Sequence, residues 1–274
     1  MASMKKLLSI AVCTLLFLYS CKNGDKAPTE DDDAPKIPTV NYAVKRTYLH
    51  DTTSFTEGFL FHDSILYEST GAQPDLLSTR SLFGAMSLQT GRINVKAELD
   101  RNKYFGEGIV FFGDKVYQLT YTTQKGFIYD AKTFKPLGDF NFPNREGWGL
   151  TTDSTYLIMS DGTSQLTYFY PDSFKIKQSI SVTDTRNPID RLNELEYING
   201  FIYANIYTTP TIVKIDPSTG NVVGKLDLST LVNEVKQMYP QSMEMNGIAY
   251  NPRTKTVFVT GKMWPVVYEI EFGL

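Results

Sequence analysis

The tetrapeptide Glu57-Gly58-Phe59-Leu60 shows the pattern that decides the fold: a polar residue, usually a glycine, and then an apolar run. The pattern returns with its second residue at positions 108, 149, 195 and 247, so the period runs from 41 to 52 residues. A period of this length, with about four short strands in each repeat, is typical of β-propeller blades. The sequence therefore predicts an all-β, five-bladed propeller. The later copies are Glu107-Gly108-Ile109-Val110, Trp148-Gly149-Leu150-Thr151, Glu194-Leu195-Glu196-Tyr197 and Asn246-Gly247-Ile248-Ala249.

Short β-rich runs separated by turn residues fill each period, and a long amphipathic helix is expected only around Ser229–Met238. An open β-sandwich is the competing architecture, but it leaves the repeat period unexplained. The strands expected in the second repeat are Gly108–Phe112, Lys115–Tyr121, Gly126–Asp130 and Leu137–Phe142. Those expected in the fourth repeat are Leu195–Ile198, Phe201–Tyr207, Ile212–Ile215 and Val222–Leu228.

The last repeat predicts how the ring closes. After Gly247 the chain has room for only three strands, Gly247–Asn251, Thr256–Thr260 and Val266–Phe272. The segment Val40–Leu49 precedes the first repeat and has strand character. We expect it to complete the fifth blade, because this pairing removes a long unpaired edge.

The N-terminus differs from the rest of the chain. Residues 1–20 have the layout of a secretory signal peptide, with Lys5 and Lys6 ahead of an apolar run that is too short for a confident membrane span. The run ends at Cys21 in a sequence that resembles a bacterial lipoprotein cleavage site, where the cysteine is lipidated. A plain signal peptide with an incidental cysteine, or a signal anchor, remains an alternative.

These features predict an exported protein, either secreted or held as a lipoprotein in the periplasm, at the outer membrane or at the cell surface. Residues 21–39 are acidic and contain prolines, so we expect a disordered tether ahead of a propeller domain over 40–274. The chain has 2 cysteines, Cys13 and Cys21, so the domain has no thiol, no disulfide and no cysteine metal site.

The start of each repeat is the predicted functional site. In a propeller the first strand of each blade lines the central channel, so equivalent residues converge at one mouth. That ring carries Glu57, Glu107, Trp148, Glu194 or Glu196, and Asn246. Crowded carboxylates raise one another's pKa, which suits acid–base chemistry near neutral pH. The alternative is that the glycines only permit close strand packing and that the carboxylates are solvated or bind a structural cation.

Several function classes are disfavoured. The formal net charge is −3, so no basic surface recommends nucleic acid as a partner. The 2 histidines, His50 and His62, are expected at a strand end and in a turn, which makes a histidine triad or a multi-histidine zinc site improbable. The sequence also lacks a G-x-S-x-G nucleophile motif, a phosphate-binding glycine loop and an H-E-x-x-H helix.

From about residue 42 to 272 the chain resembles the plant and bacterial type of glutaminyl-peptide cyclotransferase. The resemblance rests on eight stretches in order: Ser54-Phe55-Thr56-Glu57-Gly58, Tyr67-Glu68-Ser69-Thr70-Gly71, Tyr104-Phe105-Gly106-Glu107-Gly108, Gly147-Trp148-Gly149-Leu150, Ser160-Asp161-Gly162-Thr163-Ser164, Arg191-Leu192-Asn193-Glu194-Leu195-Glu196-Tyr197, Asn246-Gly247-Ile248-Ala249 and Thr260-Gly261-Lys262-Met263-Trp264-Pro265.

The resemblance implies an acyl transfer in which the α-amine of an N-terminal glutamine attacks its own side-chain amide and ammonia leaves. It implies that Glu107 shuttles the proton, and that Asn193 and Lys262 orient the amide and stabilise developing charge. The implied substrate-binding residues are Phe55, Phe105 and Trp148, with Glu57 at the rim or floor of the pocket.

This chain departs from the plant members at two positions, since Tyr121 and Tyr207 stand where those members carry tryptophan. Tyrosine keeps an aromatic wall and adds a hydroxyl, so we expect both to bind substrate, with an altered preference or rate. The chemistry needs no metal cofactor, although the resemblance allows a structural calcium ion in the channel. The expected partners are peptides or proteins with N-terminal glutamine, with no obligate protein partner.

Two rival functions remain open at this stage. A non-enzymatic propeller that binds peptide or glycan would keep the blades without needing Glu107, Asn193 and Lys262 together. A lactonase-like propeller hydrolase would need a metal ion held by carboxylates and asparagines in the channel.

Overall fold

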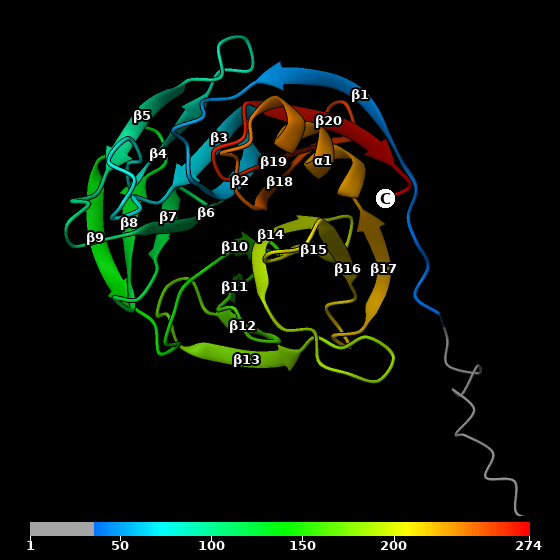
Figure 1. Ribbon diagram of the computed structural model, residues 1–274. Helices are drawn as coiled ribbons and strands as arrows, with labels where there is room; N and C mark the ends of the chain where they lie inside the picture. The colour runs from blue at the N-terminus through cyan, green and yellow to red at the C-terminus, as the bar shows by residue number, and fades with distance from the viewer. Residues whose placement is uncertain (1–35) are drawn as a thin grey trace, which may run out of the picture. The chain divides into compact units, whose positions relative to one another are not determined.

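The structure is a computed structural model that describes residues 36–274, and in this part of the chain 20 strands form five four-stranded antiparallel sheets (Figure 1). The first strands of the five sheets contact their neighbours in sequence, and the last of them contacts the first, which closes a ring around a central axis. The predicted five-bladed propeller is confirmed.

Each blade is a meander of four strands. The blades comprise β2 (Thr56–His62), β3 (Ile65–Thr70), β4 (Leu82–Met86) and β5 (Ile93–Glu98); β6 (Gly106–Phe112), β7 (Lys115–Thr120), β8 (Lys125–Asp130) and β9 (Pro136–Asn141); β10 (Leu150–Thr152), β11 (Leu157–Ser160), β12 (Gln165–Phe169) and β13 (Ile176–Ser181); β14 (Leu192–Ile198), β15 (Phe201–Ile206), β16 (Thr211–Ile215) and β17 (Val222–Asp227); and β18 (Met245–Asn251), β19 (Thr256–Gly261), β20 (Val266–Phe272) and β1 (Tyr42–Leu49).

The predicted closure of the ring is also confirmed. The fifth sheet has the order β1-β20-β19-β18, and β1 pairs antiparallel with β20 from Tyr42 opposite Phe272 to Leu49 opposite Val266. In Figure 1 the N-terminal strand lies beside the C-terminal strand at the outer edge of this blade. The edge of β20 is therefore covered by the strand that enters the domain.

Apolar side chains pack between the faces of neighbouring blades. One cluster joins Tyr203 and Leu226 of the fourth blade to Val257 and Tyr268 of the fifth, and each is buried. The expected helix is α1 (Ser229–Met238), whose buried face, Leu231 and Val235, joins the same cluster. Because every blade is held by its two neighbours, the ring keeps the five inner strands in fixed positions.

The tether differs from its prediction at its end. Ile37 packs against the core of the fourth blade, and Thr39 forms a parallel bridge with Lys225 of β17. An apolar residue and an open strand edge thus order residues that composition alone assigned to a disordered tether. The expected signal peptide, the lipidation site at Cys21 and the tether up to residue 35 lie outside the described residues. Among residues 36–274, no helix has the length and hydropathy needed to cross a membrane.

Candidate active site

A break in strand register marks the start of the inner strand in four of the blades. The shift falls at Glu57 in β2, Glu107 in β6, Asn193 in β14 and Asn246 in β18. A β-bulge inserts one residue into the strand and re-aims its side chains. These polar residues therefore depart from the alternation of an ordinary strand, and the repeated sequence pattern coincides with a repeated bulge.

The glycines of the pattern bring the inner strands close together. A Cβ atom on Gly108 would lie 2.5 Å from the main-chain nitrogen of Leu150, and one on Gly149 would lie 2.2 Å from the main-chain oxygen of Asn193. The Gly108 amide also donates a hydrogen bond to the Trp148 carbonyl at 2.8 Å. The packing role considered for these glycines is therefore correct, and it accompanies the polar site.

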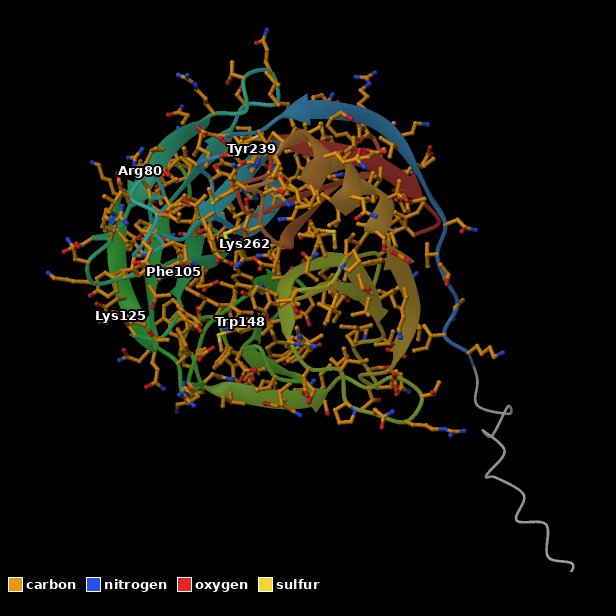
Figure 2. All side chains as sticks on the ribbon, viewed as in Figure 1. Arg80, Phe105, Lys125, Trp148, Tyr239 and Lys262 are labelled. Atoms are coloured by element: carbon orange, nitrogen blue, oxygen red, sulfur yellow. The ribbon has the colours of Figure 1, made fainter. Side chains whose placement is uncertain are left out.

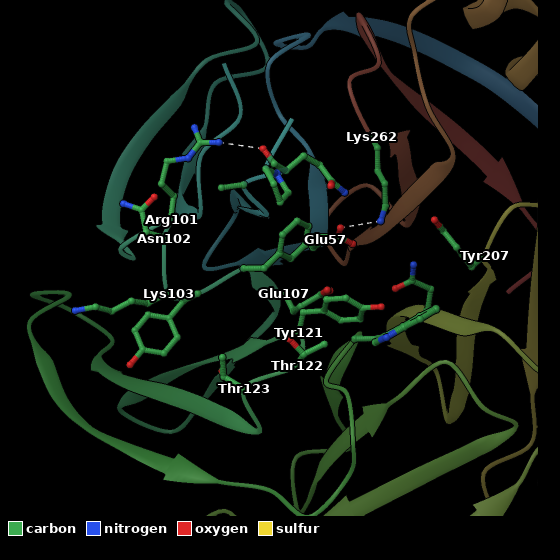
Figure 3. A pocket seen from close by; sticks show the side chains of 17 residues that line it. Glu57, Arg101, Asn102, Lys103, Glu107, Tyr121, Thr122, Thr123, Tyr207 and Lys262 are labelled. Atoms are coloured by element: carbon green, nitrogen blue, oxygen red, sulfur yellow. Dashed lines mark hydrogen bonds and ion pairs between the residues drawn. The ribbon is translucent and has the colours of Figure 1, made fainter. Parts of the chain in front are cut away.

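Lys262 and Glu57 form a buried ion pair in the centre of the site (Figure 3). The Lys262 Nζ lies 2.7 Å from Glu57 Oε1, and the two side chains are 7% and 2% exposed. Asn246 Nδ2 donates to Glu57 Oε2 at 3.1 Å. Burial raises the pKa of Glu57 to about 7, although Lys262 opposes this shift. Burial alone would lower the pKa of Lys262, but the carboxylates of Glu57 and Glu107 outweigh it and raise that pKa.

Glu107 is the second carboxyl group of the site. It is 4% exposed, and its Oε2 has no hydrogen-bond partner among the described residues. Burial, followed by the negative charge of Glu57, raises the pKa of Glu107 well above its ordinary value. A carboxyl group with one free oxygen and a raised pKa can both accept and return a proton.

Asn193 supplies an amide beside these charges. It is 2% exposed, its Oδ1 has no partner among the described residues, and its main-chain carbonyl accepts a hydrogen bond from Ser160 Oγ at 2.7 Å. The fixed backbone and the free oxygen leave Asn193 ready to accept a hydrogen bond from a ligand amine or amide.

An aromatic wall borders the charged groups. Successive rings lie 5.8 Å apart for Phe55 and Phe105, 5.9 Å for Phe105 and Tyr121, 6.5 Å for Tyr121 and Trp148, and 5.4 Å for Trp148 and Tyr207. The Lys262 ammonium lies 4.7 Å from the centre of the Phe55 ring and 5.2 Å from that of Tyr207. The first and last rings of the wall, Phe55 and Tyr207, therefore both lie beside the ammonium group of the ion pair.

These groups share one cavity of about 450 Å³. Eight of the nine predicted catalytic and substrate-binding residues line it: Glu57, Phe105, Glu107, Tyr121, Trp148, Asn193, Tyr207 and Lys262. Phe55, the ninth, is 2% exposed and does not line the cavity. It lies behind the cavity, against Lys262 and Phe105, so its contact with a ligand would be indirect.

Three predicted members of the channel ring do not line this cavity: Asn246, which donates a hydrogen bond to Glu57, and Glu194 and Glu196. Glu194 accepts hydrogen bonds from the main-chain amides of Phe59 at 3.1 Å and Ile248 at 2.8 Å. Glu196 accepts one from the Tyr250 amide at 2.8 Å and lines a separate cavity of about 200 Å³. Glu194 binds backbone of the first and fifth blades and Glu196 binds backbone of the fifth, which corrects the expectation that the acids of all the repeats converge at one mouth.

The repeat pattern did not predict the residues that line the outer part of the cavity. Residues 72–74 and 101–104 also line it, from the loops that follow β3 and β5, and Figure 3 labels Arg101, Asn102 and Lys103 on this side of the cavity. Arg101 donates hydrogen bonds to the carbonyls of Gln73, Leu77 and Thr79 at 2.9–3.0 Å, which ties the two loops together. These loops lie outside the repeated segments, so no periodic signal in the sequence could identify them.

Within residues 36–274, no three histidine, cysteine, aspartate or glutamate side chains form a group that could hold a metal ion. A calcium ion in the channel would therefore need other oxygen ligands, such as main-chain or amide carbonyls or water. The calcium expectation stays a prediction.

Comparisons with known proteins identify the family. The family model for glutamine cyclotransferase matches residues 13–272. A glutaminyl-peptide cyclotransferase of Arabidopsis thaliana is 35% identical over 259 residues, which cover 94% of this chain and 78% of that protein. The crystal structure of Myxococcus xanthus glutaminyl cyclase is 33% identical with a TM-score of 0.78, covering 86% of this chain and 98% of that one. The chain belongs to the glutamine cyclotransferase family.

Proposed function

We propose that this protein is a glutaminyl-peptide cyclotransferase, an acyltransferase that converts the N-terminal glutamine of peptides or proteins to pyroglutamate and releases ammonia. The observation that carries the proposal is one cavity that holds a carboxyl group with a free oxygen, a buried lysine and an aromatic wall. Cyclisation needs a proton acceptor, a proton donor and a cation near one small apolar stem, and these groups supply all of them.

Glu107 performs the proton transfers in this proposal. The substrate's α-amino nitrogen attacks the side-chain amide carbon, a C–N bond forms, and Glu107 Oε2 takes the proton that the amine loses. The tetrahedral intermediate then collapses, its original C–N bond breaks, and Glu107 returns the proton to the leaving nitrogen. One carboxyl group can serve both steps because the two nitrogens are attached to the same carbon.

Lys262 and Asn193 act on the amide. The Lys262 ammonium lies beside the carboxyl groups, so it can stabilise the negative charge that develops on the amide oxygen. Asn193 Oδ1 accepts a hydrogen bond from the substrate nitrogen. Glu57 holds Lys262 in place and keeps it charged, since it provides the closest negative group at 2.7 Å.

The aromatic wall binds the aliphatic stem of the glutamine. Trp148 is fixed by a hydrogen bond from Nε1 to Glu146 Oε2 at 3.0 Å, and Tyr207 packs against it edge to face. Aromatic rings bury much apolar area at a low entropic cost, so the wall can hold the stem without any charged contact.

The decisive experiment incubates purified protein with a peptide that begins with glutamine and follows the loss of ammonia by mass. A matched peptide that begins with asparagine controls for deamidation elsewhere. A parallel reaction with a chelator separates this function from a metal-dependent propeller hydrolase, and we expect full activity there. Binding of the glutamine peptide without turnover would favour a non-enzymatic binding propeller instead.

We also propose that residues 1–20 direct export and that Cys21 carries the lipid that holds the domain at a membrane. The support is the sequence layout alone. Metabolic labelling with a fatty-acid analogue should mark the wild type and not Cys21→Ala. Equal labelling of the two proteins, or labelling of neither, contradicts the anchor.

A further inference from the structure

His50 and Glu68 form a buried pair that the chemistry proposed above does not use. His50 follows β1, Glu68 lies in β3, and both side chains are 0% exposed. His50 Nε2 lies 3.0 Å from Glu68 Oε1, and His50 Nδ1 lies 2.8 Å from the carbonyl oxygen of Trp264. The pair therefore spans the junction at which the fifth blade meets the first.

The hydrogen bonds determine how many protons the pair holds. Nδ1 must carry a proton to donate to the Trp264 carbonyl, and a second proton must lie between Nε2 and Glu68 Oε1. Imidazole ordinarily binds a proton more tightly than a carboxylate does, which places this proton on the ring. Thr56 Oγ1 donates to the same oxygen of Glu68 at 2.8 Å, so this oxygen serves as an acceptor for two neighbours.

The surroundings of His50 agree with a charged ring. Burial alone would lower the pKa of His50, but the carboxylate of Glu68, with a smaller contribution from Asp51, outweighs it and raises that pKa. Thr260 Oγ1 lies 3.4 Å from Nδ1 and donates its own proton to the Val266 carbonyl. A positive ring would balance a negative charge on Glu68 in this buried place.

On the Glu68 side, hydrogen bonds connect the pair to Glu57. Thr56, which donates a hydrogen bond to Glu68, directly precedes Glu57 in β2. The Thr56 carbonyl accepts a hydrogen bond at 3.0 Å from Asn246 Nδ2, and the same nitrogen donates to Glu57 Oε2. A shift of Thr56 would therefore move both Glu57 and its amide partner.

On the His50 side, the pair is connected to the turn that follows Lys262. The turn after Lys262 holds Met263 at φ 59, with its amide donating to the Ser54 carbonyl at 2.7 Å. Trp264 follows in the same turn, its side chain is fully buried, and its carbonyl is the one that His50 holds. His50 thus fixes the turn that positions the ammonium group.

We propose that His50 is a positioning residue for the Glu57–Lys262 ion pair, acting as a doubly protonated ring held between Glu68 of the first blade and the Trp264 carbonyl of the fifth. Because His50 directly follows the strand that closes the ring, the closure of the propeller sets the geometry of the reacting groups. This role rests on the proposed function, but the protonation state of His50 can be measured without any activity.

The first test is nuclear magnetic resonance of the imidazole nitrogens in the ¹⁵N-labelled protein. The chain has 2 histidines, and a His62→Asn variant assigns the signals. We expect both nitrogens of His50 to carry protons at pH 7.5, and Glu68→Gln to convert the ring to the neutral form. A neutral His50 with one protonated nitrogen in the wild type overturns the proposal, whether or not the protein is a cyclotransferase.

The second test measures kcat and KM for a glutamine peptide. In His50→Asn the side-chain amide can replace the Nδ1 donor, and in His50→Gln it can replace the Nε2 donor. Each variant therefore removes one of the two hydrogen bonds that His50 makes. We expect each variant, and Glu68→Gln, to lower kcat at least about tenfold, because a misplacement of 1 Å can cost roughly 100-fold. KM should change less, since Trp148 and Tyr207 lie on other blades.

The matched control is Glu98→Gln, which removes an exposed ion pair with Arg80 in the same blade and should leave kcat unchanged. Wild-type kcat in folded Glu68→Gln or in both His50 variants contradicts the positioning role. An equal loss of kcat in Glu98→Gln would show that other substitutions in this blade also lower kcat, and it would contradict the positioning role as well.

Discussion

Two pairs of glutamates lie in the inner strands of the propeller and have different surroundings. Glu57 and Glu107 lie at bulges in the inner strands of the first two blades, and they face a cavity, a lysine and an aromatic wall. Glu194 and Glu196 lie in the inner strand of the fourth blade, where main-chain amides donate to both oxygens of Glu194 and to one oxygen of Glu196. All four pKa values are raised, with burial as the main cause.

The difference teaches that burial and a raised pKa do not by themselves mark a catalytic acid. An oxygen without a hydrogen-bond partner and a place in the cavity lining separate Glu107 from Glu194, whose two oxygens accept backbone hydrogen bonds and which does not line the cavity. The first pair can take part in chemistry, and the second holds neighbouring blades together. Four substitutions test this distinction.

Glu107→Gln should have the largest effect. Glutamine keeps the shape of the side chain but cannot take up the proton, so kcat should fall by roughly 10²–10⁴-fold. KM and the melting temperature should change little, because the aromatic wall and the Lys262–Glu57 pair remain. Steady-state kinetics with a glutamine peptide and calorimetry check both parts. Most of the wild-type turnover in this variant would falsify the proton-shuttle role.

Lys262→Met should lower both activity and stability. It leaves Glu57 buried without its cation, and the loss of one partner of a buried pair costs about 3–5 kcal/mol. The loss of stability should be larger at pH 8 than at pH 5.5, because in the wild type Lys262 stabilises the ionised form of Glu57, which with a pKa of about 7 is mostly protonated at the lower pH. The double variant Glu57→Gln, Lys262→Met should recover stability but not turnover. A double variant with wild-type turnover contradicts the role of Lys262.

Glu194→Gln should give the opposite result to Glu107→Gln. Its amide can offer one oxygen to one of the two backbone amides and presents an NH₂ group to the other. An unsatisfied buried donor costs about 1–3 kcal/mol, so denaturant unfolding should show a loss of this size. The kcat of the folded enzyme should stay within about threefold of the wild type. A large loss of kcat without a loss of stability would place Glu194 in the chemistry.

Glu196→Gln should have the smallest effect, visible in the pH dependence of stability. Burial raises the pKa of Glu196 to about 8, so the folded state holds a proton that the unfolded state releases near pH 4.5. This contribution is complete below about pH 4.5 and is lost as the pH rises to about 8. The wild type should therefore melt at a higher temperature at pH 5.5 than at pH 8. The difference should shrink in Glu196→Gln, and an unchanged difference contradicts the shift.

The repeat pattern was sufficient to predict the blades and the residues at their inner ends. Apolar alternation and turn residues are local signals, so the predicted ends of most strands lie within two residues of the observed ones. The inner strands begin earlier than predicted, at Gly106 and Leu192, because they continue across a bulge that no local pattern announces. The resemblance to a known family added Asn193, Lys262, Tyr121 and Tyr207, which lie outside the short repeated motif.

By itself, the sequence determined the number of blades, the ring closure and the identity of the polar residues at the channel. The repeat period and the residue types can be read directly from the order of residues, without knowledge of distant contacts. Only the tertiary structure decided which acids face a cavity and which bind backbone. That choice depends on residues of other blades: Lys262 and Glu57 are 205 positions apart, and the amide that donates to Glu194 Oε1 belongs to Phe59, 135 positions away. Contacts between such distant residues exist only once the ring has closed, so no local pattern can encode them.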